Sequence, residues 1–281
     1  MISYNIQSEE KSSLEKTAAM LNYVMHKKHF SADYLKWEYL DNPVGKALTQ
    51  NAYEDDKLIG HYGAQPIISK ISDKNHQGLF ILNAAVMPEY QGKGILRTLV
   101  ENLHSNAAKN GFGFLIGVGN KNSTPIYTKK FGFRSLGPAD VKIGFGLPDA
   151  DMNKEVLYER IWDGESLRWR LNNPNTKYSS SLKNNLTVLF KGNYPGLSTI
   201  MGMFREPRFD LGSLTNNKNP GINIFLGKDP EINWKQNRSF ISFPEVIKPS
   251  PLVLIFKELN NNRFSFTGEQ IRFRCIDFDA F

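Results

Sequence analysis

The stretch VMPEYQGKGI, residues Val86–Ile95, decides the fold of this chain because of what lies on either side of it. Before it, Gly78–Val86 is short and almost wholly apolar, as expected of a strand buried on both faces. After it, apolar residues recur at three- and four-residue intervals as far as Ala107, and Asn110-Gly111 supplies a helix C-terminal stop. Glycines at a strand-to-helix turn let main-chain N–H groups converge on an anion at the helix N-terminus. The stretch therefore predicts a pyrophosphate cradle, against the alternative of a tight glycine turn that binds nothing.

Two common nucleotide-binding motifs are absent from the same region. The P-loop pattern GxxxxGK[ST] fails because Gly94 is followed by Ile95 and not by lysine. The dinucleotide fingerprint GxGxxG also fails, since Gly111 and Gly113 are followed by Ile116 where the third glycine belongs. The cradle therefore needs a different assignment.

The remainder of the first half predicts a mixed sheet with covering helices. Its other expected elements are a helix with Leu14, Ala18, Leu21, Val24 and Met25 on one face, a helix from an N-cap at Ser31 to about Leu40, strands at Ala47–Tyr53, Leu58–Ile71 and Phe112–Val118, and a helix at Ser123–Lys130. This alternation of strands and helices around the glycine turn is typical of an α/β fold.

Composition and charge limit the classes of function. The 281 residues are 40% hydrophobic and 12% aromatic, which suits a globular chain and not a disordered one. The one cysteine, Cys275, excludes an internal disulfide framework and a cysteine-based zinc site, so no metal is expected. No apolar run approaches the ~20 residues of a membrane-spanning helix, and the first ten residues do not resemble a signal peptide, so we expect a cytoplasmic location without membrane insertion. The net charge of +7 suits an anionic small ligand or is simply a solvated basic surface, and the absence of any Lys/Arg run of five disfavours nucleic acid.

A composition change near Leu147–Met152 predicts two domains, 1–148 and 149–281. The strands expected in the second domain are Leu186–Phe190, Thr199–Phe204, Ile222–Phe225, Leu252–Lys257 and Ile271–Cys275. A weak internal echo joins the halves, because Leu35–Pro43 resembles Leu167–Pro174 with one residue deleted. Either the echo is chance, or the second half duplicates the first.

The glycine stretch resembles motif A of the GCN5-related N-acetyltransferase (GNAT) superfamily, V-x-P-x-x-[QR]-G-x-G-[ILV]. The matching residues are Val86, Pro88, Gln91, Gly92, Gly94 and Ile95, while Leu96 departs from the glycine or alanine that many members have. Downstream, Asn120, Tyr127 and Gly132-Phe133 resemble the end of the family's next strand and helix. The spacing from Tyr127 to Gly132 is one residue longer than is usual in the family, and the usual spacing would place Thr128 at the tyrosine position. The resemblance covers about residues 10–145. It implies a GNAT fold of the α/β (α+β) class with a mixed central sheet, followed by a second, divergent GNAT-like domain.

The resemblance also implies the co-substrate, an acyl-CoA such as acetyl-CoA or a hydroxyacyl-CoA. In the family the glycine loop binds the pyrophosphate, and the preceding strand pairs with the pantetheine arm. The residues expected to bind it here are Ala84, Ala85, Val86, Gln91, Gly92, Lys93, Gly94, Ile95, Leu96 and Asn120. The second half has no such turn, so we expect it to lack CoA binding.

Three residues are the candidates for the chemistry. Tyr127 could protonate the leaving thiolate, or it could be an ordinary core tyrosine. The strand Leu79–Val86 contains no carboxylate or histidine, and Asn83, its one polar side chain, is expected to bind substrate or pantetheine. His61 on the preceding strand could be the base or a structural histidine, and base catalysis by water is the remaining alternative.

The whole chain resembles two-part bacterial GNAT proteins of surface-polysaccharide synthesis, including N-acyltransferases of dTDP-linked 3-amino-3,6-dideoxy sugars. This implies a nucleotide-linked amino sugar as acceptor, with Trp37, Glu38 and Trp169 as substrate-binding candidates, although both tryptophans also suit a core. Two alternatives remain. The protein could be an N-acetyltransferase that acts on a protein, a peptide or another small amine, or it could be a GNAT-like binding module without catalytic activity. The sequence determines neither the acyl group nor the oligomeric state.

Overall fold

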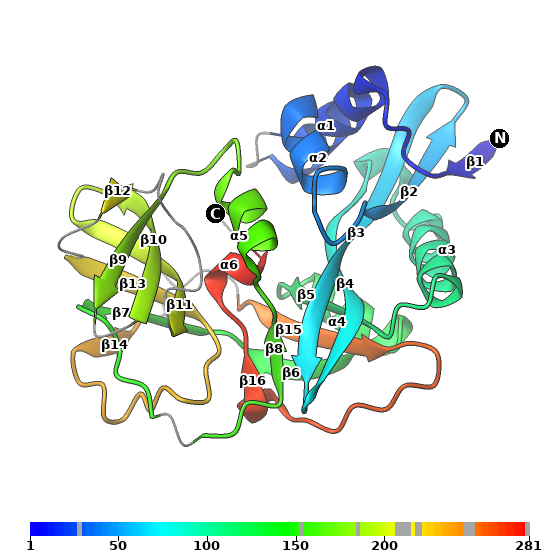
Figure 1. Cartoon of the computed structure of the whole chain (residues 1–281). Coiled ribbons are helices and arrows are strands. Elements are labelled where there is room, and N and C mark those ends of the chain that lie inside the picture. The colour runs from blue at the N-terminus through cyan, green and yellow to red at the C-terminus, as the bar shows by residue number, and fades with distance from the viewer. Residues whose placement is uncertain are drawn as a thin grey trace.

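The computed structural model describes residues 1–26, 30–151, 154–183, 186–205, 215–216, 221–243 and 251–278. Two sheets lie side by side with short helices between them (Figure 1). The path of the first sheet is β1-β2-β3-β4-β5-β15-β6, with β8 and β16 attached to it, and the order of the second is β12-β9-β10-β11-β13-β7-β14. The expected mixed α/β class is therefore confirmed.

The elements up to residue 145 are β1 (Ile2–Asn5), α1 (Lys11–Met25), α2 (Ala32–Tyr39), β2 (Leu48–Glu54), β3 (Lys57–Ile71), β4 (Lys74–Val86), the 3-10 turn η1 (Pro88–Tyr90), α3 (Ile95–Lys109), β5 (Phe114–Gly119), α4 (Ser123–Lys130), β6 (Arg134–Pro138) and β7 (Asp140–Phe145). Those that follow are β8 (Tyr158–Arg160), α5 (Gly164–Leu171), β9 (Tyr178–Lys183), β10 (Leu186–Tyr194), β11 (Leu197–Arg205), β12 (Thr215–Asn216), β13 (Ile222–Gly227), β14 (Phe240–Ser242), β15 (Val253–Glu258), η2 (Gly268–Gln270), β16 (Ile271–Arg272) and α6 (Cys275–Phe278).

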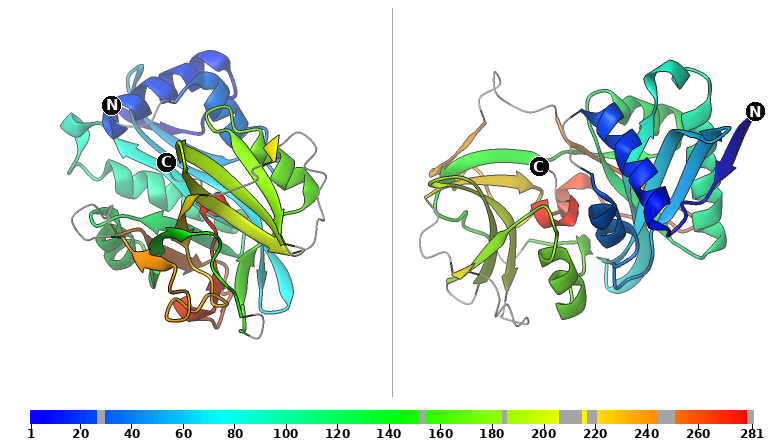
Figure 2. Two further views of the ribbon diagram at one scale, coloured as in Figure 1. Left: turned by 90° about the vertical axis from the view of Figure 1, so that its left-hand side faces the viewer. Right: turned by 90° about the horizontal axis from the view of Figure 1, so that it is seen from above.

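The helices of the first half form where local signals predict them. Ser31 caps α2, because its Oγ accepts the Tyr34 N–H at 3.1 Å. Helix α3 buries its apolar stripe, including Ile95 and Leu99, against β2, β3 and β4. Helices α1 and α2 cover one face of this sheet and α3 covers the other (Figure 2). The strands β6 and β7 were not predicted, since their half-buried residues give no clear alternation.

The second sheet repeats the plan of the first. In the first sheet β4 pairs parallel with β5, and in the second β11 pairs parallel with β13. Each of these pairs is extended by a strand from the other half of the chain, because β5 pairs antiparallel with β15 and β13 pairs antiparallel with β7. The last neighbours then follow, β6 beside β15 and β14 beside β7. The two halves have thus exchanged corresponding strands.

This exchange crosses the predicted domain boundary. Strand β7 precedes residue 148 and lies in the second sheet, whereas β15 follows it and lies in the first. The division into 1–148 and 149–281 stays a prediction about sequence ancestry, and the two sheets are not separable along it.

The echoed segments meet in space. They form α2 and α5, and Trp37 stacks on Trp169 with ring centroids 5.0 Å apart and planes 18° apart. Trp37 Nε1 donates to the Trp169 carbonyl and Trp169 Nε1 donates to the Trp37 carbonyl, both at 2.9 Å. Such reciprocal contacts are typical of a two-fold relation. Together with the shared strand plan, they favour duplication over chance.

The chain end differs from its prediction. The expected strand Ile271–Cys275 is β16 over Ile271–Arg272 only, and the helix α6 begins at Cys275. Burial of Cys275 and Ile276 against β11 and β13 favours the helix over a longer strand. The asparagine-rich stretches Asn184-Asn185 and 217–219 lie outside the described residues, as do residues 279–281. None of the helices in the described part of the chain is both long and apolar enough to cross a membrane.

Candidate acyl-CoA site

The glycine turn is open on the side where a ligand would sit. Gly92 and Gly94 have φ values of 77° and 81°, and no heavy atom lies within 4 Å of a Cβ built on either residue. Gly94 is the N-cap of α3 and brings no side chain to cap the helix. The first N–H groups of α3 therefore face an open cradle, which fits a phosphate group.

The strands beside this turn separate toward it. β4 and β5 pair at only two positions, Leu79 with Leu115 and Phe80 with Ile116. From there on, the residue pairs formed by β4 in the described chain are with β3. The β5-facing edge of β4 near Ala84–Val86 is thus available to an extended amide chain such as pantetheine, so the residues present fit CoA.

The predicted cofactor residues surround this gap. Ala84 and the turn residues Gln91, Gly92, Lys93 and Gly94 are exposed, while Ala85, Val86 and Ile95 are buried and Leu96 is half-buried. Gln91 Nε2 donates to the Val86 carbonyl at 3.1 Å, which holds the turn against the strand. Asn120 Oδ1 accepts the N–H groups of Asn122 and Ser123 at 2.9 Å and so orders the loop that enters α4. Their roles in CoA binding stay predictions.

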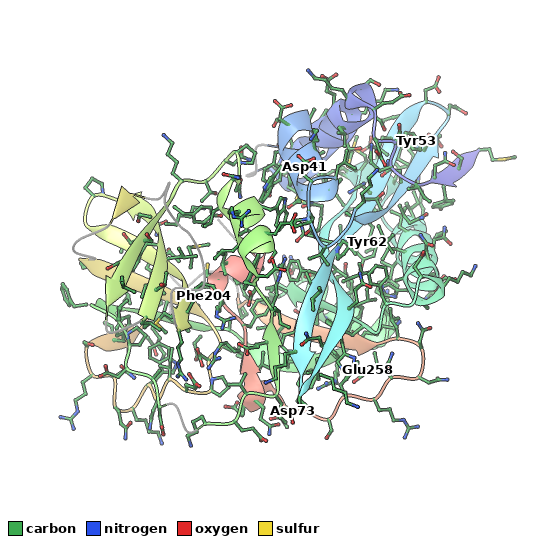
Figure 3. All side chains as sticks on the ribbon, viewed as in Figure 1. Asp41, Tyr53, Tyr62, Asp73, Phe204 and Glu258 are labelled. Atoms are coloured by element: carbon green, nitrogen blue, oxygen red, sulfur yellow. The ribbon has the colours of Figure 1, made fainter. Side chains whose placement is uncertain are left out.

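Tyr127 lies on α4 with its ring packed among aromatic side chains. Its neighbours include Tyr62, Phe131 and Phe133, with ring centroids 5.2–6.5 Å away. Tyr62 comes from β3, on the α3 side of the sheet (Figure 3). Burial raises the pKa of Tyr127 to about 12, so its hydroxyl keeps its proton at neutral pH. A tyrosine of ordinary pKa is also protonated there, so this environment fits a core tyrosine as well as a thiolate-protonating one.

Asn83 lies at a bulge in β4. Its φ is 52°, and the pairing with β3 shifts between Ala85 opposite His61 and Leu82 opposite Gly63. Its amide donates to Glu38 Oε2 at 2.5 Å and to the Tyr39 hydroxyl at 2.8 Å. Glu38 is 6% exposed and also accepts the Tyr34 hydroxyl at 2.9 Å. The bulge thus brings a carboxylate from α2 to the strand that lacks one.

His61 lies behind this group and is fully buried. Its Nδ1 is 2.6 Å from Asn51 Oδ1, and its Nε2 is 2.7 Å from the Tyr39 hydroxyl. Because Asn51 Oδ1 can only accept, the network assigns the proton to Nδ1, and Tyr39 then donates to Nε2. Burial lowers the pKa of His61 to about 3, so the ring is neutral. Neither ring nitrogen is left for an acceptor molecule.

A groove of about 540 Å³ lies between α2 and α5. Its lining comes in corresponding pairs from α2, α5 and the turns that follow them: Asp33 and Glu165, Trp37 and Trp169, Asp41 and Asn172, and Pro43 and Pro174, together with Arg168. Asp41 stands at the end of α2 (Figure 3). Because one face of each indole is covered by the other, the tryptophans contribute mainly edges to the groove.

Sequence reasoning missed three members of the buried network, Tyr34, Tyr39 and Asn51. The spacing of Tyr34 and Glu38, four residues apart on one helix, could have indicated their contact. The contacts of Tyr39 and Asn51 with His61 join separate elements, and no local pattern encodes them. Within the described ranges, no group of three or more His, Cys, Asp or Glu side chains could hold a metal ion.

Comparisons with known proteins agree with this geometry. Residues 5–135 match the family model described as "Acetyltransferase (GNAT) domain". Among solved structures, a probable N-acyltransferase from Enterococcus faecalis V583 aligns with a TM-score of 0.63 at 10% identity, over 92% of this chain and 73% of its own. A GCN5-related N-acetyltransferase from Anabaena variabilis has a TM-score of 0.61 at 12% identity, over 92% and 73%. Eis1 from Mycobacterium abscessus has 0.59 at 11% identity, over 90% and 73%. No curated protein matches the chain.

Residues 5–135, slightly less than half of the chain, are therefore similar to a GNAT acetyltransferase domain, and this match supports an enzyme that uses CoA. The likeness to the solved structures extends across both halves and concerns the fold. The acceptor is not determined by either comparison.

Proposed function

We propose that the protein transfers an acyl group from acyl-CoA to the amino group of a nucleotide-linked amino sugar for polysaccharide synthesis. The observation that carries the transferase part is the opening between β4 and β5 beside the uncapped start of α3. The net charge of +7 supports an anionic acceptor beside an anionic co-substrate. The second sheet, joined to the first through α2 and α5, would form part of the acceptor site.

In this reaction the amine attacks the thioester carbonyl carbon while the carbon–sulfur bond breaks. A main-chain N–H on Asn83–Val86 would hold the developing oxyanion, because hydrogen-bond donors placed at that oxygen stabilise the transition state. Tyr127 would give its hydroxyl proton to the leaving thiolate as a general acid. Acyl-CoA supplies the activated acyl group, and the residues around the glycine turn would position it.

One observation favours a second candidate acceptor, a cationic amine such as a polyamine or a lysine side chain. Three carboxylates, Asp33, Asp41 and Glu165, line the groove between α2 and α5 against one guanidinium, Arg168, and Asp41 is also paired with Lys36. Carboxylates repel a pyrophosphate and attract an ammonium group.

The test is an acyl-transfer assay with a dTDP-linked amino sugar, the same sugar without its nucleotide, spermidine and a lysine peptide. Turnover should be highest for the nucleotide sugar, because its remote nucleotide helps to position the amine. Equal rates with and without the nucleotide, or a preference for spermidine or the peptide, would contradict the nucleotide-sugar acceptor.

Two neighbouring substitutions on α5 distinguish the candidates. Arg168→Gln should raise KM for the nucleotide sugar, whereas Glu165→Gln should raise KM for spermidine, in each case by a few-fold. Both side chains are exposed, so neither substitution should alter folding.

A further inference from the structure

Glu38 is a buried carboxylate whose hydrogen-bond partners are neutral. Its two oxygens accept from the Tyr34 hydroxyl and the Asn83 amide, and no ion pair in the described part of the chain includes it. A carboxylate removed from water without a cationic partner costs stability. A buried charge without a counter-charge breaks a rule that proteins break mainly at functional sites, so Glu38 is a candidate for a functional role.

The position of Glu38 matches that need. It contacts the amide of Asn83, one residue before the exposed Ala84, on the β4 segment that has left β5. The strand itself provides no base, because Asn83 is its one polar side chain between Leu79 and Val86. A carboxylate from α2 is therefore hydrogen-bonded to the strand beside the opening, at the point where the strand lacks one.

The duplicate helix carries no equivalent group. Arg170 on α5 occupies the place that corresponds to Glu38 on α2, one residue after the matching tryptophan. Its guanidinium is 3.5 Å from Gln65 Oε1 and lies over the Trp169 ring. The carboxylate thus belongs to the half with the open glycine turn and is absent from its counterpart.

A buried chain of hydrogen bonds holds Asn83 in place. The Asn83 amide donates to Tyr39, Tyr39 donates to His61, and His61 donates to Asn51. Asn51 in turn donates to Gln7 Oε1 at 2.8 Å. Because Tyr39, His61 and Asn51 are 0–1% exposed, the chain leaves Asn83 little freedom to turn away from Glu38.

Building on the proposed function, we propose that Glu38 binds the acceptor as an ammonium ion and takes its proton, with Asn83 and Tyr39 as positioning residues. One proton passes from nitrogen to Glu38, and the freed lone pair forms the carbon–nitrogen bond. As the carbon–sulfur bond breaks, its electron pair leaves on sulfur. After the attack the nitrogen loses a second proton, which balances the proton that Tyr127 gives to the thiolate. The proton taken by Glu38 passes to solvent, so one proton is released overall.

The first test needs no acceptor. Glu38→Gln keeps the shape of the side chain and removes a buried charge; its oxygen can accept from Asn83, and the Tyr34 hydroxyl can turn to accept from the new NH2 group. We expect the urea midpoint of unfolding to rise relative to the wild type. Glu15→Gln, which changes an exposed carboxylate on α1, should leave the midpoint unchanged. A lower midpoint for Glu38→Gln would overturn the inference, because it would identify Glu38 as a structural residue.

The second test uses turnover with the four acceptors named above. Glu38→Gln should lower kcat/KM by about 10²–10⁴-fold at neutral pH without weakening CoA binding. The deficit should shrink as the pH approaches the pKa of the amine itself, since a neutral amine needs no base. The other titratable or charged groups near Glu38 are Tyr34, Tyr39, His61 and Arg170, and their substitution should leave this pH-dependent recovery in place. Loss of less than threefold at every pH would overturn the inference.

The positioning role is tested by Tyr39→Phe, which breaks the link between His61 and Asn83. It should lower kcat about tenfold with little change in KM, and it should cause no further loss in a Glu38→Gln background. An equal loss in both backgrounds would refute the positioning role. If the wild type acylates none of the four amines, the proposed function fails, while the urea midpoints still decide the state of Glu38.

Discussion

The two halves of the chain share one strand plan and differ at the place where the first half is open. In the first sheet the gap between β4 and β5 leads to the uncapped start of α3. In the second sheet β11 and β13 also pair over a short stretch, Leu197–Ile200 with Ile222–Phe225. There the segment around Phe273 fills the gap between the two strands. It is held beside the end of β13, because Lys228 and Phe273 exchange two backbone hydrogen bonds of 2.7 and 2.8 Å.

The cavity left between the second pair of strands is only about 10 Å³, and Phe273, Arg274 and Cys275 form part of its wall. It is therefore far too small for the arm of a cofactor. The comparison teaches that the same backbone plan can hold a ligand site in one copy and a packed chain segment in the other. It also shows that the copies depend on each other, because each contributes a strand to the other's sheet.

The largest expected effect comes from separating the halves. A fragment of residues 1–148 loses β15, whose Leu254, Ile255 and Phe256 are fully buried. At roughly 1.5–3 kcal/mol for each buried side chain, the loss approaches the whole stability of a typical domain. We expect circular dichroism to show no cooperative unfolding for 1–148 alone, and co-expression with 149–281 to restore it. A cooperatively folded 1–148 fragment would break the comparison.

The next largest effect is expected from removing the hydroxyl of Tyr127, which is proposed to protonate the thiolate. Tyr127→Phe should lower kcat by about 10²–10⁴-fold and leave the Kd for CoA almost unchanged. Tyr158→Phe is the matched control, because that hydroxyl is equally buried but bonds Ser69 near β8. Steady-state kinetics of both variants decide the matter, and a loss of less than threefold in Tyr127→Phe would remove the assignment.

A smaller effect tests whether only the first half binds CoA. Gly94 and Gly111 bracket α3, share a φ of 81°, and have no heavy atom within 4 Å of a built Cβ. Alanine should therefore introduce similar backbone strain at both sites, but only Gly94→Ala places a methyl group in the proposed cradle. We expect calorimetry to find one CoA site per chain, weakened about tenfold by Gly94→Ala and unchanged by Gly111→Ala. Two equivalent sites, or equal losses in both variants, would contradict this.

A separate prediction concerns pH, because His61 and His104, both in the first half, are buried. Burial lowers the pKa of His61 and His104 to about 3, with Lys257 adding to the effect at His104. The unfolded chain, with histidine pKa values of about 6.5, therefore binds protons that the folded chain does not. Stability should fall as the pH drops from about 6.5 toward 3, by up to about 1.4 kcal/mol per pH unit for each histidine.

Urea midpoints across this pH range measure the effect. His104→Gln should reduce the slope of the urea midpoint against pH, whatever it does to the stability at neutral pH. A control substitution at the more exposed His76 should leave the slope as it is. An unchanged slope in His104→Gln would mean that this ring is not held neutral.

Local patterns determined much of the first half. The helices α1 to α4, the β2–β3 hairpin and the glycine turn were predicted because each depends on residues close together in the sequence. Ser31 as an N-cap is one such case, since the donor of its hydrogen bond lies three residues away. The echo of Leu35–Pro43 in Leu167–Pro174 likewise anticipated that α5 corresponds to α2.

The sequence by itself thus determined the glycine turn and the class of fold, because these rest on short-range spacing, and the resemblance of that turn to motif A implied the co-substrate. Only the tertiary structure decided that β15 completes the first sheet, that β7 completes the second, and that Glu38 meets Asn83. Strand pairing and side-chain contact across 45 residues or more depend on which surfaces bury one another, and an apolar pattern does not specify its partner. For the same reason β15 was recognised as a strand of the second half, but its pairing with β5 of the first half was not predicted.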